Sequence, residues 1–163
     1  RKQDSVDALC DILLDDGLQL SMVGLGTNPQ TLPEFVSHPL GMVGSDAVLL
    51  GEHPSPRTYG CFPVILAEFV RAEKQLRLPE AIRKMTSFPA QRLGLKKRGI
   101  LRDGMKADIV VFNPKTVKAT ATFHEPKQFP VGIPYVIVNG KIVIDQNVHT
   151  GELPGKALRH GRD

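Results

Sequence analysis

An acidic and a basic residue lie in one short stretch of the sequence, where an apolar segment gives way to a loop rich in glycine and proline. Asp46 directly follows the apolar segment, and Arg57 comes eleven residues later. Catalytic groups of parallel α/β architectures stand at the carboxyl ends of strands, where a carboxylate can take a proton from an activated water. Asp46 is therefore a candidate proton acceptor. The alternative interpretation is that it caps a turn.

Two further polar residues belong to the loop. The guanidinium fork of Arg57 suits a carboxylate ligand, which it can hold through two parallel hydrogen bonds. The alternative is a surface arginine packed on Tyr59. His53 precedes Pro54 and is equally well explained as a loop residue without a chemical role.

Other catalytic motifs are missing from the sequence. The remaining histidines, His38, His124, His149 and His160, form neither HxH nor HExxH and no Cys/His cluster, so a complete metal site cannot be recognised. There is no P-loop, no GxGxxG in a βαβ context and no GxSxG. The motifs thus support neither nucleotide binding nor serine hydrolysis.

The composition of the chain limits the kinds of partner that it can bind. The 163 residues have the length of one domain, and the net charge is +4. The one basic run, Lys96–Arg98, has no interleaved aromatic residue, so we predict no nucleic-acid partner. No apolar run approaches the roughly 18 residues of a membrane span, and the first residues carry no apolar signal region. We expect neither a membrane segment nor a secretory signal.

The two cysteines, Cys10 and Cys61, are well separated and form no CxxC. We predict reduced thiols in a cytoplasmic protein, with Cys10 in the core.

The elements before the loop alternate between helix and strand. Apolar spacing predicts a helix that Asp4 or Ser5 caps and that Gly17 ends in a left-handed conformation, followed by a strand, Leu18–Val23. A capping box at Thr31–Glu34 opens a short helix toward Ser37, and Gly41–Asp46 is predicted as a buried strand. This alternation is typical of a parallel α/β sheet or barrel.

After the loop, which extends from Ala47 to Gly60, helices are predicted at Cys61–Lys74, Leu78–Thr86 and Ser87–Leu93. Strand-like patterns follow Gly99.

These patterns predict a strand at Ile109–Phe112 and a hairpin of Tyr135–Val138 with Lys141–Ile144, joined by the type I′ turn Asn139-Gly140. We therefore divide the chain into residues 1–98, an α/β part with the loop at 46–60, and residues 99–163, a β part. Each part has too few strands for a closed barrel or a sandwich, as if each belonged to something larger.

A family resemblance rests on the same loop. The residues Gly44-Ser45-Asp46, His53-Pro54, Pro56-Arg57, Tyr59-Gly60 and Phe62-Pro63 resemble those of the D-aminoacylases, the N-acyl-D-amino-acid deacylases of the amidohydrolase superfamily. Similar stretches follow at 78–95, 99–114 and 138–140. The tail at His149–Gly151 and Pro154–Arg159 is also similar, so the resemblance covers nearly the whole chain.

The resemblance implies the carboxy-terminal portion of a zinc-dependent (β/α)8 barrel, together with strands of a small β-sandwich. It implies that Asp46 touches the metal centre and serves as general base and acid, and that Arg57 binds the α-carboxylate of an N-acyl-D-amino acid. Zinc would activate the attacking water. The sequence departs from the family's pattern at Ala47 and Val64, and the family's amino-terminal Cys and His ligands have no counterpart here.

Two alternatives remain open. One is a non-catalytic scaffold with the amidohydrolase fold, which an upstream sequence without an HxH-type metal motif would favour. The other is a dihydropyrimidinase-like cyclic amidase, although a cyclic imide has no carboxylate for Arg57 to bind. The chain offers only Asp46 as a metal ligand, so we expect it to be inactive alone and to self-associate through unpaired strand edges, or to cover them with its helices.

Overall fold

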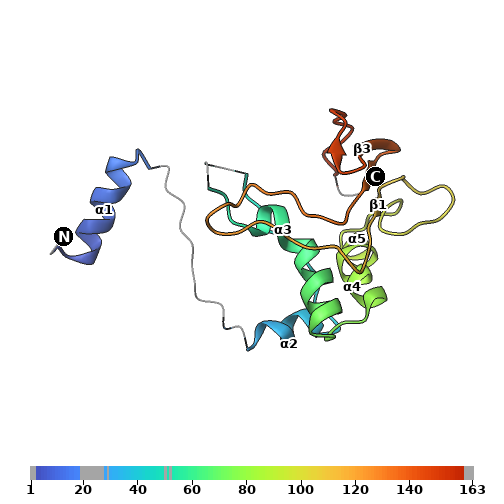
Figure 1. Cartoon of the computed structure of the whole chain (residues 1–163), viewed down its shortest axis with the longest axis horizontal. Helices are drawn as coiled ribbons and strands as arrows, with labels where there is room; N and C mark the ends of the chain where they lie inside the picture. The colour runs from blue at the N-terminus through green and yellow to red at the C-terminus, as the bar shows by residue number, and fades with distance from the viewer. Residues whose placement is uncertain (1–2, 19–27, 29, 50, 52, 160–163) are drawn as a thin grey trace.

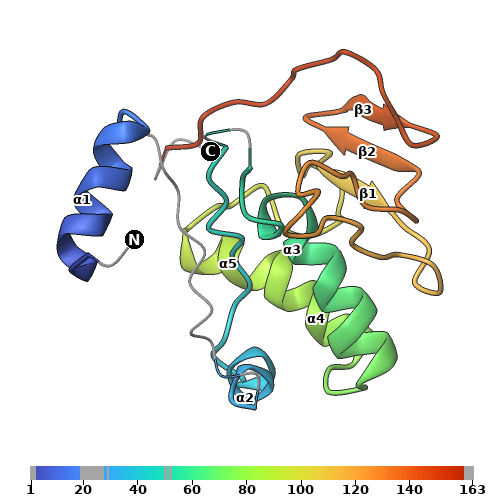
Figure 2. The same ribbon diagram turned by 60° about the vertical axis from the view of Figure 1, so that its left-hand side comes forward.

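The computed structural model describes residues 3–18, 28, 30–49, 51 and 53–159. Within these ranges the chain forms a group of helices and one antiparallel sheet, so the α/β class is confirmed. Figure 2 shows the strands on one side of the helices that follow residue 57. None of the described helices is both long enough and apolar enough to span a membrane.

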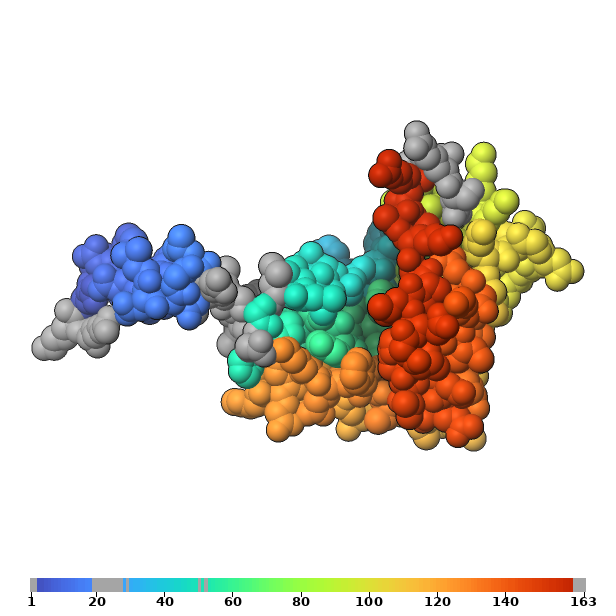
Figure 3. Space-filling view, turned by 90° about the horizontal axis from the view of Figure 1, so that it is seen from above, coloured from blue at the N-terminus to red at the C-terminus, as the bar shows by residue number. Residues whose placement is uncertain are grey.

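The first helix, α1 (Ser5–Asp15), lies apart from the rest of the molecule (Figures 1 and 3). As predicted, the Asp4 side chain caps it by accepting a hydrogen bond from the Val6 backbone N–H at 2.9 Å, and Gly17 follows it with a left-handed φ of 62°. The apolar face is exposed, however, and the prediction that Cys10 is a core residue is wrong. The predicted strand Leu18–Val23 lies outside the described residues except for Leu18.

The second helix, α2 (Leu32–Ser37), forms where predicted, but without the capping box. The Thr31 hydroxyl donates instead to the Asn28 carbonyl, at 3.2 Å. The predicted strand Gly41–Asp46 is also wrong, because these residues form no ladder in the described structure and Met42 is 44% exposed. The Val43 N–H donates to the carbonyl of Lys84, which belongs to a helix. A strand requires a neighbouring strand, and this segment packs against a helix instead.

The predicted loop ends earlier than expected. Helix α3 (Arg57–Val64) begins inside it, and a π-helix, η1 (Ile65–Ala72), continues α3. The wider register begins two residues after Pro63, which has no N–H to donate to the carbonyl four residues earlier. The predicted helix Cys61–Lys74 therefore exists, but it starts four residues sooner and changes its register.

Two short helices follow. Helix α4 (Leu78–Met85) carries Pro79 in its first turn, as predicted, and α5 (Ser87–Arg92) ends before Gly94.

The sheet has the strand order β1 (Ile109–Val111), β2 (Tyr135–Val138), β3 (Lys141–Asp145) and β4 (Val148–His149), with every pair antiparallel. The predicted hairpin is confirmed. A bulge between Val136 and Ile137 interrupts its register. Strand β4 was not predicted, because Gln146 and Asn147 make the turn before it with positive φ values and no glycine.

Several hydrogen bonds hold the turn between β2 and β3. Asn139 and Gly140 have φ values of 48° and 81°, the signs that a type I′ turn requires. The Asn139 side chain accepts a hydrogen bond from Arg98 Nη2 at 2.8 Å and donates one to the Pro154 carbonyl at 2.8 Å. The Gly140 N–H donates to the Ala107 carbonyl at 2.9 Å.

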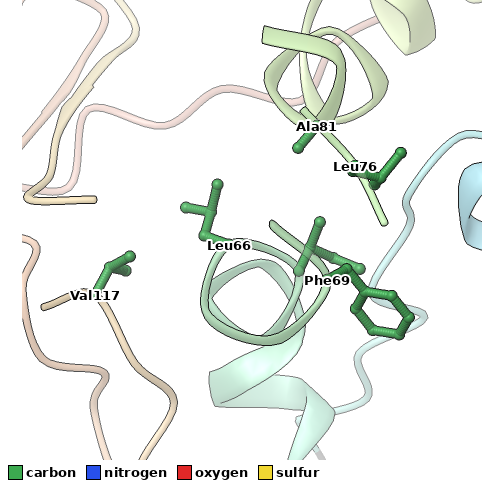
Figure 4. Packing of buried hydrophobic residues seen from close by; sticks show 6 residues of the cluster. Leu66, Phe69, Leu76, Ala81 and Val117 are labelled. Atoms are coloured by element: carbon green, nitrogen blue, oxygen red, sulfur yellow. The ribbon is translucent and has the colours of Figure 1, made fainter. Parts of the chain in front are cut away.

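The buried core lies between the helices and the segment that leads into the sheet (Figure 4). Its members come from η1, the following turn, α4 and the segment after β1: Ile65, Leu66, Phe69, Leu76, Ala81 and Val117. Gly132 packs against Val117 so closely that a Cβ at position 132 would lie 2.6 Å from the Val117 nitrogen. The core thus joins η1 to α4 and to the segment after β1.

Candidate functional site

Asp46 ends the extended segment that follows α2. Its φ of 46° lies in the left-handed region, which Asp adopts more readily than most L-residues. Its side chain is 83% exposed, so its carboxylate is open to a ligand from solvent.

Arg57 is the first residue of α3, and its guanidinium reaches back to Asp46. Nη2 of Arg57 donates to Oδ2 of Asp46 at 2.8 Å, although eleven residues separate the two. The pair is exposed on both sides, so water and salt weaken its attraction. The structure therefore brings together the two residues that the sequence singled out.

Cys61 is a third member of this cluster, and sequence reasoning gave it no role. It lies one helical turn after Arg57, and its Sγ is 3.8 Å from the Gly44 carbonyl oxygen. Desolvation raises the pKa of the Cys61 thiol, and the nearby Arg57 charge partly opposes this rise. The sequence analysis predicted a loop up to Gly60, whereas α3 begins at Arg57. This earlier start places residues 57 and 61 on one helix face.

His53 and Tyr59 are the remaining candidates of the loop. His53 comes between Asp46 and Arg57 in the sequence, and its side chain is exposed. The Tyr59 ring packs edge-to-face on Phe129, with centroids 5.6 Å apart. An apolar cleft of about 550 Å³ between α4 and β1 includes neither Asp46 nor Arg57, so it is a separate feature of the surface.

The cluster does not form a metal site by itself. Across the described residues, no three His, Cys, Asp or Glu side chains gather where they could hold an ion. A protein zinc site uses at least three such ligands, and Asp46 is one carboxylate whose Oδ2 already accepts from Arg57. These residues therefore do not fit zinc without further ligands.

Asp46 and Arg57 can nevertheless combine proton acceptance with the binding of a carboxylate. A carboxylate accepts protons, and a guanidinium has five N–H donors, of which the bond to Asp46 uses one. Arg57 can thus bind a second carboxylate while it remains beside Asp46. A molecule held in this way would have its own carboxylate next to a proton acceptor.

Comparison with known proteins identifies the family of the chain. The model of the amidohydrolase family matches residues 10–144. The chain is 46% identical to N-acyl-D-aspartate deacylase from Alcaligenes xylosoxydans xylosoxydans over 77% of its own length and 25% of that protein. It is 43% identical to D-aminoacylase from the same organism, over 72% of the chain and 24% of the relative. The chain thus spans about a quarter of the length of these curated relatives.

Solved structures show the same similarity. A crystal structure of D-aminoacylase matches with a TM-score of 0.75 and 36% identity, over 77% of this chain and 27% of that one. N-acyl-D-glutamate deacylase from Bordetella bronchiseptica, complexed with zinc and a phosphonate inhibitor, matches with a TM-score of 0.70 and 39% identity, over 72% and 25%. The family match, the relatives and the shared fold together show that this chain belongs to the amidohydrolase family.

Proposed function

We propose that this chain is the carboxy-terminal part of a longer enzyme that hydrolyses the amide bond of N-acyl-D-amino acids with the help of zinc. The proposal extends to the predicted architecture: residues 1–98 as the last βα units of a (β/α)8 barrel, and residues 99–163 as part of a small β-sandwich. The metal ligands beyond Asp46 would come from the rest of that enzyme. The reduced thiols of Cys10 and Cys61 support a further proposal, that the protein is cytoplasmic.

The observation that carries this proposal is the contact between Arg57 and Asp46. In an N-acyl-amino acid, one carbon atom separates the carboxylate from the amide nitrogen. A guanidinium that binds the carboxylate while it touches Asp46 therefore brings the scissile amide close to the proton acceptor. The contact fits this substrate class better than a cyclic imide, which has no carboxylate.

The proton transfers follow from this geometry. Asp46 takes a proton from water as the water oxygen bonds to the carbonyl carbon. It then gives that proton to the amide nitrogen as the carbon–nitrogen bond breaks, which yields a carboxylic acid and a free D-amino acid. Arg57 holds the substrate throughout and transfers no proton.

The test uses the full-length enzyme with N-acetyl-D-aspartate and N-acetyl-D-glutamate as substrates. We expect Asp46→Asn to lower kcat by about 10²–10⁴-fold, the usual contribution of a general base. The exposed Asp103 offers a matched control, since Asp103→Asn should leave kcat unchanged. Wild-type turnover in Asp46→Asn would remove Asp46 from the mechanism.

A second experiment tests the carboxylate contact. Arg57→Ala should raise KM for an N-acetyl-D-amino acid but leave KM unchanged for the corresponding carboxamide, which has no carboxylate to lose. Arg102→Ala, at an exposed position, is the control. Equal increases in KM for both compounds would show that Arg57 does not bind the carboxylate.

A further inference from the structure

A lysine side chain is buried in α4 beside the segment that leads to Asp46. Lys84 has 0% exposed surface, and its Nζ donates hydrogen bonds to the carbonyl oxygens of His38 and, at 2.9 Å, of Gly41. Lysine is almost never fully buried unless it is paired. Both partners belong to residues 38–46, which we call the strap.

Two more hydrogen bonds tie this end of the strap to α4. Arg83 Nη2 donates to the Pro39 carbonyl at 3.2 Å, and the Val43 N–H donates to the Lys84 carbonyl at 3.1 Å. The strap forms no strand ladder in the described structure. Its path therefore depends on these contacts with a helix.

The other end of the strap meets α3. Cys61 Sγ lies 3.8 Å from the Gly44 carbonyl oxygen, and Arg57 bonds to Asp46. The contacts at the Asp46 end are weak, since a thiol is a poor donor and the ion pair is exposed. The buried contacts at Lys84 are the stronger of the two sets.

We infer that Lys84 is a positioning residue, which fixes the strap on α4 so that Asp46 is presented to the reacting amide. Lys84 would act through the backbone of residues 38–43 and would not touch the substrate. This inference rests on the proposed function for its catalytic consequence, but the mechanical link between Lys84 and the strap can be tested without it.

The link does not require a charged lysine. Desolvation lowers the pKa of Lys84, and the nearby Glu80 carboxylate opposes that shift. An ammonium has three N–H donors and a neutral amine has two, so either form can satisfy the two carbonyls. Only a side chain without donors, such as methionine, removes both bonds.

The first experiment compares hydrogen exchange in the 163-residue chain and its Lys84→Met variant. We expect amides of residues 40–46 to exchange about fivefold faster or more in the variant, with the β2–β3 hairpin unchanged. Lys96→Met, at an exposed lysine, should change neither region. An unchanged rate in the strap of Lys84→Met would overturn the inference.

A second variant covers the case in which Lys84→Met unfolds the chain and the hairpin also loses its protection. From the strap, Arg83→Met removes only the bond to Pro39; it also removes the contacts of Arg83 with Glu80 and with the Phe88 ring. If Lys84→Met unfolds the chain, the inference requires that residues 40–46 exchange faster in Arg83→Met than in the unchanged chain. Equal exchange rates in these two proteins would overturn it.

The last experiment uses the full-length enzyme. If Lys84 positions Asp46, Lys84→Met should lower kcat by roughly 10- to 100-fold, whereas KM should change little because Arg57 remains. Unchanged kcat alongside faster strap exchange would reduce Lys84 to a structural role and overturn the inference. A wild-type enzyme that deacylates nothing would instead refute the proposed function, and the exchange result would still stand.

Discussion

Removing the Asp46–Arg57 ion pair should change the stability of the chain very little, because both side chains are largely in water. The arginine and aspartate side chains are 53% and 83% exposed, and the N–O distance is 2.8 Å. Two unit charges about 4 Å apart in water attract each other by roughly 1 kcal/mol, and the entropy of ordering two side chains offsets part of this. We expect a coupling free energy of about 0.2–1 kcal/mol between Asp46→Asn and Arg57→Ala.

The assay is a double-mutant cycle by urea denaturation, in which each variant's unfolding free energy comes from its transition midpoint and slope. The chain has no tryptophan, so far-UV circular dichroism is the appropriate signal. The pair Lys141–Glu152, at 2.9 Å with side chains 59% and 48% exposed, gives a matched second cycle. A coupling above about 2 kcal/mol at Asp46–Arg57, persisting in 1 M salt, would refute the reasoning, because screening should remove an exposed pair.

Two further predictions concern the thiols and the core. Thiol alkylation followed by mass spectrometry should label the exposed Cys10 faster than Cys61, whose pKa burial raises. Arg57→Ala should slow Cys61 further, since removing the cation raises that pKa and lowers the thiolate fraction; faster labelling would contradict this sign. Gly132→Ala should destabilise the chain by about 1–3 kcal/mol in the urea assay, because φ is 80° and the new Cβ would overlap the Val117 backbone. Unchanged stability would mean that this contact relaxes freely.

Local signals in the sequence predicted the elements that local interactions determine. The Asn139-Gly140 pair identified its hairpin, because a type I′ turn needs two positive φ values that these residues adopt cheaply. The Asp4 cap and Gly17 bounded α1 for equally local reasons. The state of Gly41–Asp46 depends on what lies beside it, and no local pattern contains that information.

The candidate site was predicted in its residues but not in its contacts. A spacing of eleven residues does not require Asp46 to meet Arg57; the start of α3 inside the predicted loop brings them together. Lys84 was overlooked because lysine is usually solvent-exposed. It lies three residues after the buried Ala81, on the inward face of α4, and only the helical period could have indicated its burial.

The hydrogen bonds that hold the turn between β2 and β3 also affect how readily Asn139 deamidates. An Asn-Gly pair deamidates when the glycine nitrogen attacks the side-chain amide carbon of the asparagine and expels ammonia. In this turn, Asn139 Oδ1 and Nδ2 are bound to Arg98 and Pro154, and the attacking nitrogen of Gly140 is bound to Ala107. Ring closure must wait until these bonds open together. The Asn139-Gly140 pair, which makes the turn easy to form, is therefore protected from deamidation for as long as the strands and the tail remain in place.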